Sequence, residues 1–417
     1  MIPLAWDEVV ALELGALDGG DEITGIEADS RDVRPGDLFV ALNAGVEFVA
    51  DARARGAATL VPDDQVAALA ALASLVRSKS DAHVVAVVGS AGKTTTKDIL
   101  GALCAPHART IWAEKSLNNE IGLPLTVCRL EPNTQILVTE MGMRGLGQIS
   151  ALCEIAQPRV AVVPHIGPEH LELLGSVERV AEANAEAIAS LPAGGTAVVP
   201  ARSEALEPYL TRADIVLRRF DPDDVDMRDG TTSFTVGDET IRLELPFTQR
   251  HLAVNTLAAL HAFDALGLPL ERAQEGVSGI LLSPWRGEEI ALPGGGFVVN
   301  DAYNANPDSM RAALEHLAER AGERRKIAIL GQMAELGAAS ETYHREIGAL
   351  SAGLEIEVIG VGESARAYEP VAWAPTADEA RVLARALIEP GDAVLVKASR
   401  AVGLEGIADE IANFARA

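Results

Sequence analysis

The chain has 417 residues, of which 48% are hydrophobic and 23% are charged, and its formal net charge is −26. This length predicts about two to four domains, and the negative charge argues against binding to nucleic acid or anionic membranes, which requires a basic surface. Three cysteines without paired spacing indicate reduced thiols in a cytoplasmic protein. No apolar run reaches the roughly 18 residues of a membrane helix, so we expect no membrane insertion.

Short strand-like and helix-like stretches alternate over the first part of the chain. A Pro-Gly turn precedes an expected strand at residues 37–42, and an Ala- and Leu-rich stretch at 63–79 predicts a helix. Residues 84–88 then form an uninterrupted valine-rich run, which is typical of a buried parallel strand. We place the first domain boundary before this run, so that the first domain covers residues 1–81.

Strand and helix patterns keep alternating beyond this boundary, which predicts an α/β fold with mostly parallel sheets. We expect strands at 135–139, 160–163 and 196–199, helices at 97–103, 177–191 and 251–266, and a polar β-hairpin at 220–245. A second α/β unit of the Rossmann-like, dinucleotide-binding type follows, with strands at 296–300, 326–330, 355–360 and 393–396 and a helix at 309–320. The second and third domains therefore cover residues 82–283 and 284–417.

A glycine-rich turn joins the strand at 84–88 to the following helix. It contains the residues Gly89, Ser90, Ala91, Gly92, Lys93, Thr94 and Thr95. Its glycines let backbone N–H groups face a phosphate, and the helix N-terminus adds partial positive charge. Lys93 can reach the β- and γ-phosphates of ATP, and the Thr94 hydroxyl can bind Mg²⁺. The turn therefore predicts a P-loop of a shorter variant, since Val87 stands where the eight-residue pattern has glycine.

Polar residues follow the expected strands of the central domain. Glu140 ends one strand and His170 follows another, at the sheet edge where ligands collect. The P-loop, residues 116–124 with their Asn118-Asn119 pair, Glu140-Met141-Gly142 and residues 166–171 together resemble the Mur ligase superfamily. Members of this superfamily use ATP to join an amino group to a carboxylate. The resemblance implies that Asn118 and Asn119 contact substrate, and that Glu140 and His170 bind a second Mg²⁺.

The third domain carries the most specific resemblance. Residues 300–310 leave a strand, turn at Asn306-Pro307 and start a helix, for which we expect Asp308 or Ser309 as the cap. This segment resembles the branch of the superfamily that adds D-alanyl-D-alanine. The resemblance assigns nucleotide contacts to Asp301 and Tyr303, and acceptor-site contacts to Asn304, Asn306, Lys397 and Ser399.

Three further segments resemble the superfamily. Residues 284–288 carry Arg286, which the resemblance assigns to the ATP phosphates. Asn255, at the start of the expected helix 251–266, is assigned to the neighbourhood of the adenine. Residues 29–39 resemble the segment that binds the uridine diphosphate of the substrate, which makes Ser30 and Arg31 candidate contacts.

One position departs from the superfamily. Asn184 stands where a lysine usually carries a carbamate that completes the second Mg²⁺ site. Three alternatives remain open. Asn184 binds Mg²⁺ through its carbonyl or a water, Glu182 or Glu186 reaches the metal instead, or catalysis is impaired.

The resemblance implies a three-domain Mur ligase with ATP and Mg²⁺ as cofactors. ATP would phosphorylate the carboxylate of a UDP-N-acetylmuramoyl-tripeptide, and the amine of D-alanyl-D-alanine would attack the acyl phosphate. Lys93, Arg286 and His170 are the expected catalytic residues. The alternatives are a sister ligase that adds a diamino acid, a folylpolyglutamate-type enzyme, or a nucleotide-binding homologue without ligase activity. We expect a monomer.

Overall fold

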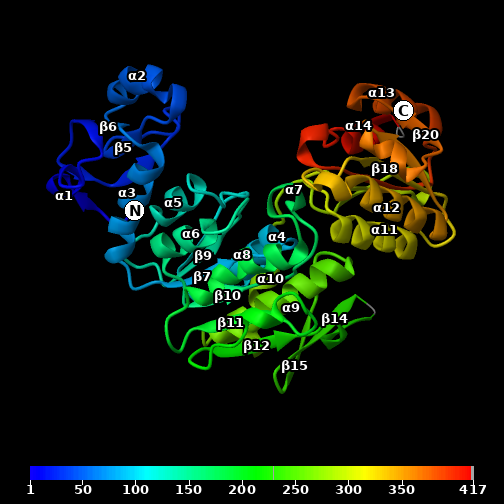
Figure 1. Ribbon diagram of the computed structural model, residues 1–417, viewed down its shortest axis with the longest axis horizontal. Coiled ribbons are helices and arrows are strands. Elements are labelled where there is room, and N and C mark those ends of the chain that lie inside the picture. The colour runs from blue at the N-terminus through cyan, green and yellow to red at the C-terminus, as the bar shows by residue number, and fades with distance from the viewer. Residues whose placement is uncertain (229, 415–417) are drawn as a thin grey trace.

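The computed structural model describes residues 1–228 and 230–414. Its strands form three larger sheets, of four, six and six strands, together with a three-stranded and a two-stranded sheet. The three larger sheets follow one another along the chain, and Figure 1 shows the N-terminal and C-terminal parts standing on either side of the central part. Most neighbouring strands are parallel and are connected through helices, which confirms the predicted α/β class.

The N-terminal part is built around the strand order β2-β6-β5-β4, in which β5 pairs parallel with both neighbours. Its elements are β1 (Leu4–Ala5), α1 (Trp6–Val10), β2 (Gly15–Asp18), β3 (Glu22–Ile23), β4 (Gly25–Glu27), β5 (Asp37–Val40), η1 (Asn43–Phe48), α2 (Val49–Ala54), β6 (Ala58–Pro62) and α3 (Gln65–Ser78). Asp64 starts α3 by accepting hydrogen bonds from the backbone N–H groups of Val66 and Ala67 at 3.0 Å. Leu69, Leu72 and Val76 of α3 share one hydrophobic core with the central part.

The central sheet is parallel throughout, in the order β12-β11-β10-β7-β9-β8. Its elements are β7 (His83–Val87), α4 (Lys93–Cys104), β8 (Thr110–Trp112), α5 (Gly122–Val127), β9 (Ile136–Glu140), α6 (Gln148–Ala156), β10 (Val160–Val162), α7 (Leu171–Leu174), α8 (Val177–Ala189), β11 (Thr196–Pro200), η2 (Glu207–Tyr209) and β12 (Val216–Phe220), followed by η3 (Pro222–Asp224), α9 (Arg250–Ala265), η4 (Leu270–Arg272) and α10 (Gln274–Val277). Side chains of β7 alternate between two cores. Val84 and Ala86 face α3, α5, α6 and α8, whereas Val85 and Val87 face α4 and α9.

In place of the β-hairpin expected at 220–245, residues 225–228 and 231–243 form a three-stranded antiparallel meander, so that expectation is wrong. The strands are β13 (Val225–Arg228), β14 (Thr231–Val236) and β15 (Glu239–Leu243). The strand β13 buries a single side chain, Val225, while Asp226 and Arg228 are exposed, so it carries little hydrophobic pattern in the sequence. Figure 1 places this meander below α9.

The C-terminal sheet has the order β16-β17-β21-β18-β19-β20, with β16 as an antiparallel edge and the other strands parallel. Its elements are β16 (Glu288–Ala291), η5 (Pro293–Gly295), β17 (Phe297–Asn300), α11 (Pro307–Ala321), β18 (Lys326–Gly331), η6 (Gly337–Ala339), α12 (Ser340–Gly353), β19 (Ile356–Val361), η7 (Ser364–Tyr368), β20 (Ala372–Ala374), α13 (Ala377–Leu387), β21 (Ala393–Lys397), η8 (Arg400–Val402) and α14 (Ile407–Phe414). Helices α11 and α12 pack on one face and α13 and α14 on the other. This doubly wound sheet confirms the predicted Rossmann-like unit.

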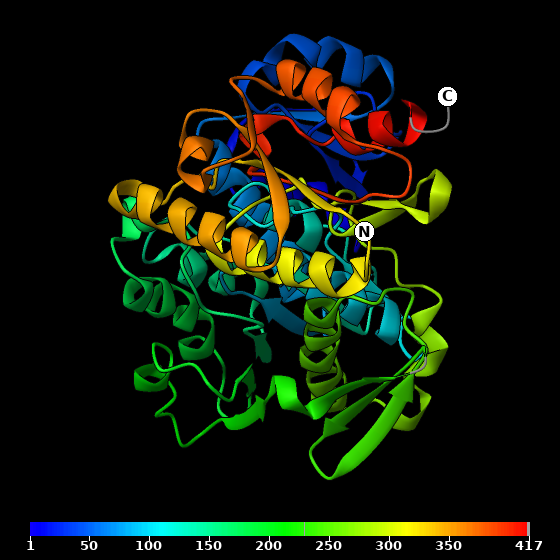
Figure 2. The ribbon, with the colours of Figure 1, turned by 90° about the vertical axis from the view of Figure 1, so that its right-hand side faces the viewer.

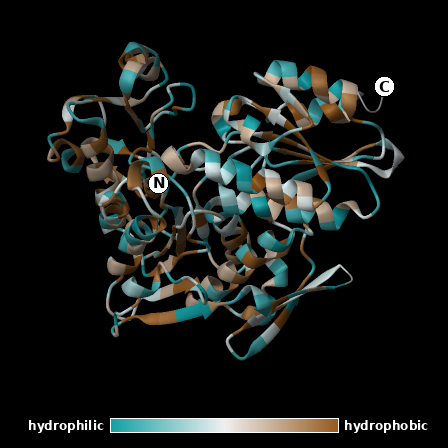
Figure 3. Cartoon of the chain, turned by 45° about the vertical axis from the view of Figure 1, so that its right-hand side comes forward, coloured by the Kyte–Doolittle hydropathy of each residue, from teal (hydrophilic) through white to brown (hydrophobic). Residues whose placement is uncertain are grey.

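The helices are amphipathic rather than uniformly apolar. In Figure 3 they change between hydrophobic and hydrophilic colours along their length, and Figure 2 shows α11 and α12 running across the front of the C-terminal sheet. Within residues 1–228 and 230–414, no helix combines the length and the hydropathy needed to span a bilayer.

Cys104, Cys128 and Cys153 are buried and unpaired, and burial raises the pKa of each thiol to about 12.

Candidate nucleotide and ligase site

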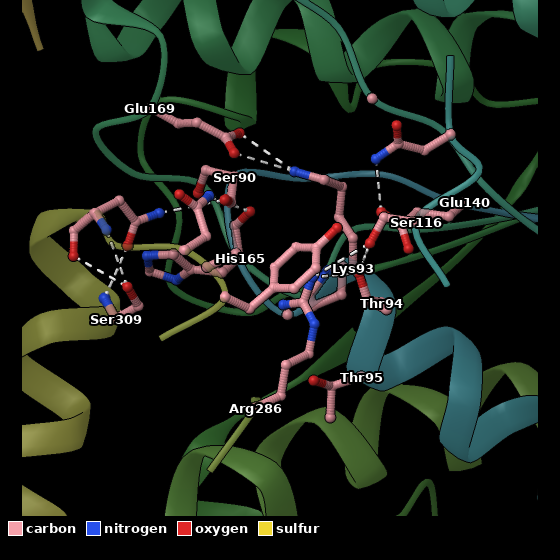
Figure 4. A pocket seen from close by; sticks show the side chains of 18 of the residues that line it. Ser90, Lys93, Thr94, Thr95, Ser116, Glu140, His165, Glu169, Arg286 and Ser309 are labelled. Carbon is pink, nitrogen blue, oxygen red and sulfur yellow. Dashed lines mark hydrogen bonds and ion pairs between the residues drawn. The ribbon is translucent and has the colours of Figure 1, made fainter. Parts of the chain in front are cut away.

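A cavity of about 680 Å³ lies where the P-loop of the central part faces the C-terminal part. The cavity brings together the following predicted site residues: Ser90, Ala91, Gly92, Lys93, Thr94, Thr95, Asn118, Asn119, Glu140, His170, Asn255, Arg286, Asp301, Tyr303, Asn304, Asn306 and Lys397. These residues come from segments that are up to about 300 positions apart, and Figure 4 shows several of them converging on Lys93. The predicted residues Gly89, Asn184, Ser30, Arg31 and Ser399 do not line it.

The P-loop requires glycine at two positions. Gly89 and Gly92 have φ angles of +118° and +79°, which side chains disfavour. A Cβ on Gly92 would lie 2.5 Å from Asn255 Oδ1, and one on Gly89 would lie 2.7 Å from the His165 carbonyl oxygen. Helix α4 begins directly after Gly92, so its free N–H groups and partial positive charge lie at the cavity. The loop therefore has the geometry that phosphate binding requires.

Arg286 reaches the P-loop from the C-terminal part of the chain. Its Nη2 donates a hydrogen bond to Thr94 Oγ1 at 2.8 Å, and its guanidinium lies 4.0 Å from the ring centroid of Tyr303. Its Nε is buried without a hydrogen-bond partner in the described part of the chain. The stacked ring fixes the plane of the guanidinium. The Nε donor, which has no partner among the described residues, suits a phosphate oxygen.

Glu140 has the properties of a cation ligand. Its carboxylate is 1% exposed, and Oε1 accepts a hydrogen bond from Asn118 Nδ2 at 2.7 Å. The other oxygen, Oε2, is buried and has no partner among the residues that the structure describes. An unpaired buried carboxylate oxygen, on a residue that lines the same cavity as Thr94, fits a hard cation such as Mg²⁺. No three His, Cys, Asp or Glu side chains of the described residues form a ready metal site, so phosphate and water would complete the coordination.

His170 joins the central part to the C-terminal part. Its Nδ1 forms a hydrogen bond with Glu335 Oε2, and the Glu172 N–H donates to the Glu335 carbonyl oxygen at 2.9 Å. His170 Nε2 lies 3.7 Å from Glu169 Oε1. A second bridge between these parts joins His165 Nε2 to Asp308 Oδ2 at 2.8 Å. Sequence reasoning missed all of these partners, although Glu169 directly precedes His170 and offered a local signal.

The segment after β17 forms the opposite wall of the cavity. Lys397 is 2% exposed, and its Nζ donates to Asp301 Oδ2 at 2.6 Å and to the Asn304 carbonyl oxygen at 2.9 Å. The expected cap at Asp308 or Ser309 is wrong. Helix α11 begins at Pro307, and the Asn306 side chain accepts the Ser309 N–H at 2.9 Å, because proline favours the first helical position and asparagine the one before it.

Three predicted substrate contacts lie elsewhere. Ser399 is 3% exposed, and its Oγ accepts a hydrogen bond from the Ala334 N–H at 2.8 Å, so it supports the wall of the site from outside the cavity. Ser30 and Arg31 belong to the N-terminal part, where Arg31 pairs with Asp29 and its side chain is 83% exposed. Their assignment to the uridine diphosphate stays a prediction.

Asn184 contacts the P-loop backbone. It is 1% exposed, its Oδ1 accepts the Gly89 N–H at 2.5 Å, and its Nδ2 donates to the Val180 carbonyl oxygen at 2.8 Å. Both polar atoms of the amide thus form hydrogen bonds with the protein backbone, outside the cavity. Glu186 accepts the N–H groups of Gly147 and Ser150 at 2.6 and 2.9 Å and so holds the start of α6. The structure thus places Asn184 behind the P-loop, where it holds the Gly89 backbone, and its metal ligation stays a prediction.

Replacing Asn184 with alanine is expected to lower nucleotide affinity. The change leaves the buried Gly89 N–H without an acceptor, which destabilises this conformation of the P-loop by about 1–3 kcal/mol. Isothermal titration calorimetry with ATP measures the effect, and Glu182→Gln on the same helix is the control. Activity of the unmodified protein should not respond to bicarbonate, since Asn184 cannot be carbamylated. Bicarbonate-dependent activity, or unchanged ATP affinity in the alanine variant, would contradict this account.

Acidic residues outnumber basic ones around the cavity. Four cations and five carboxylates line it, namely Lys93, Arg144, Arg286 and Lys397 against Glu120, Glu140, Glu169, Asp301 and Asp308. Desolvation lowers the pKa of His251, at the start of α9, to about 4, so that this histidine adds no charge at neutral pH. A polyphosphate therefore needs additional cations in this cavity, which the unpaired oxygen of Glu140 is placed to hold.

Comparison with known proteins agrees with this geometry. Residues 87–263 match the family model "Mur ligase middle domain", and residues 285–400 match "Mur ligase, glutamate ligase domain". The UDP-N-acetylmuramoyl-tripeptide–D-alanyl-D-alanine ligase of Bacillus subtilis is 32% identical over 93% of both chains. That of Escherichia coli is 30% identical over 98% of both chains.

Solved structures agree as well. A crystal structure of MurF from Acinetobacter baumannii has a TM-score of 0.86 and 26% identity over 99% of both chains. MurF from Thermotoga maritima, in complex with ADP, has a TM-score of 0.82 and 27% identity over 94% of this chain and 98% of that one. The chain therefore belongs to the Mur ligases, in the family of the UDP-N-acetylmuramoyl-tripeptide–D-alanyl-D-alanine ligases.

Proposed function

We propose that the chain is an ATP-dependent ligase that adds D-alanyl-D-alanine to UDP-N-acetylmuramoyl-tripeptide during peptidoglycan precursor synthesis. The observation that carries this proposal is that the P-loop lysine Lys93 lines the same cavity as Arg286, Asp301 and Lys397 of the C-terminal part. A phosphate site and an acceptor site must share one space for acyl transfer through a phosphorylated carboxylate. The names of the relatives above support this choice of substrates.

The residues of the cavity divide between the two steps of the reaction. Lys93 and the N–H groups of the P-loop hold the β- and γ-phosphates, and Arg286 stabilises the charge that develops as the phosphoryl group moves to the substrate carboxylate. Thr94, Glu140 and His170 would hold Mg²⁺, which neutralises phosphate charge when bound. Lys397, fixed by Asp301, is placed to bind the carboxylate of the incoming dipeptide, so that the amine of the dipeptide can attack the acyl phosphate.

The remaining assignments follow from this proposal. We assign residues 1–81 to binding of the uridine diphosphate through Ser30 and Arg31, 82–283 to ATP, and 284–417 to the acceptor. Each of these ranges holds one of the three larger sheets. The monomeric state stays a prediction. The buried, protonated thiols support a cytoplasmic location.

Acceptor choice tests the proposed function. Phosphate release should require both UDP-N-acetylmuramoyl-tripeptide and D-alanyl-D-alanine, and a dipeptide should be used in preference to a free amino acid. A coupled assay with D-alanyl-D-alanine, diaminopimelate and lysine as competing acceptors measures this preference. Preferential use of diaminopimelate or lysine would reassign the chain to a sister ligase. ATP binding without any release of phosphate would indicate a homologue without ligase activity.

A further inference from the structure

Glu169 is a buried carboxylate that pairs with the P-loop lysine. It is 8% exposed, and its two oxygens lie 3.2 and 3.3 Å from Lys93 Nζ. Figure 4 shows the Lys93 side chain extended toward Glu169, with Glu140 on the other side of Lys93 in this view. The ion pair satisfies both charges while no phosphate is present.

The arrival of a nucleoside triphosphate must break this arrangement. Lys93 Nζ now donates to the Gly89 carbonyl oxygen at 2.5 Å and to Glu169, and a β- or γ-phosphate would compete for the same ammonium. Once Lys93 turns to the phosphate, Glu169 becomes a buried anion beside a polyanion. Both the lost partner and the like charges raise the free energy of that state. A replacement cation must therefore reach Glu169.

The surroundings of Glu169 suit a divalent cation. His170 Nε2 lies 3.7 Å from Glu169 Oε1, and the other ring nitrogen is already hydrogen-bonded to Glu335. The same cavity contains the unpaired Oε2 of Glu140, whose side chain is 1% exposed. No residue of helix α8 lines the cavity, and its Glu186 and Asn184 are bonded to the start of α6 and to Gly89.

We propose that Glu169 exchanges Lys93 for a divalent cation when a nucleoside triphosphate binds, and that Glu169 and His170 then act as its protein ligands. The proposal rests on the proposed function only in requiring that the cavity binds a nucleoside triphosphate. In this account one buried carboxylate has two successive partners. Without nucleotide, Glu169 holds the P-loop lysine in place, and with nucleotide it recruits the additional positive charge that the cavity needs.

The test is a count of bound metal ions. Mn²⁺ is titrated into the full-length chain with the non-hydrolysable β,γ-imido analogue of ATP, and free Mn²⁺ is followed by electron paramagnetic resonance. The unmodified protein is expected to bind two Mn²⁺ ions per bound analogue. Glu169→Gln keeps the shape but removes the charge, and should weaken one of these two by about tenfold or more. Glu172→Gln changes an exposed acid three positions further along, in α7, and serves as the matched control.

The outcomes are distinguishable. Failure of the unmodified protein to bind the analogue would overturn the proposed function itself. Normal analogue binding, with the same Mn²⁺ affinities in Glu169→Gln, would overturn only the role of Glu169. Tighter analogue binding without metal, at unchanged Mn²⁺ affinity, would show that Glu169 is merely a counter-ion for Lys93. Glu169→Asp keeps the charge, so a return of the second ion in that variant supports the proposal if Glu169→Gln proves unstable.

Discussion

Replacing Lys93 with alanine is expected to lower kcat/KM by about 10²–10³-fold, or more, while the fold stays intact. The ammonium is the positive charge that the P-loop places against the transferred phosphoryl group, and no other lysine lines that end of the cavity. The side chain lies at the first position of α4 and is 14% exposed, outside the hydrophobic cores of the described residues. Phosphate release and the thermal unfolding midpoint measure the two effects separately.

A second variant controls for the anion left behind. Lys93→Ala leaves the buried Glu169 carboxylate without its cation, and this unpaired charge itself destabilises the site. The double variant Lys93→Met with Glu169→Gln leaves no unpaired charge, so its thermal unfolding midpoint should match that of the unmodified protein while it stays inactive. Lys79→Ala alters a surface lysine that is 30% exposed and should have normal activity. Near-normal ligation by Lys93→Ala would show that the P-loop assignment is wrong.

Replacing Lys397 with alanine is expected to lower the free energy of unfolding by about 3–5 kcal/mol and to abolish use of the dipeptide. The ammonium is 2% exposed, while the Asp301 side chain that it faces is 17% exposed. Removing the ammonium leaves Asp301 charged and unpaired, and leaves the Asn304 carbonyl oxygen without its donor. Lys397 would then no longer hold the Asp301 segment in the cavity, so both dipeptide binding and the free energy of unfolding should decrease.

Urea unfolding of three variants separates the two roles of Lys397. The double variant Lys397→Met with Asp301→Asn should recover most of the stability, because no unpaired charge remains, yet it should still not use the dipeptide. Lys326→Ala is the control on the neighbouring strand β18, since Lys326 pairs at 3.7 Å with a carboxylate that is 90% exposed. Such a pair contributes about 0–1 kcal/mol. Full activity in the double variant would remove Lys397 from the acceptor site.

The sequence by itself determined the parts of this protein that depend on neighbouring residues. The valine-rich strand, the two glycines and Lys93 lie within one short stretch, and local rules of backbone conformation suffice to predict a strand, a phosphate-binding turn and a helix there. The doubly wound sheets follow from the same alternation of patterns. Local rules were also available for α11, where Asn306 and Pro307 are the cap and the first helical residue, although the expected cap was placed two or three positions too late.

Only the tertiary structure decided which side chains face one another across the site. Glu169 and Lys93 are 76 positions apart, His170 and Glu335 are 165 apart, and Asn184 and Gly89 are 95 apart. Periodicity predicts which face of a helix is buried, but it does not say which element covers that face. Asn184 shows the consequence. Its place in the sequence suggested a metal ligand, whereas the packing of α8 behind the sheet brings its amide to the Gly89 backbone, because a buried amide takes the donor and acceptor that lie within reach.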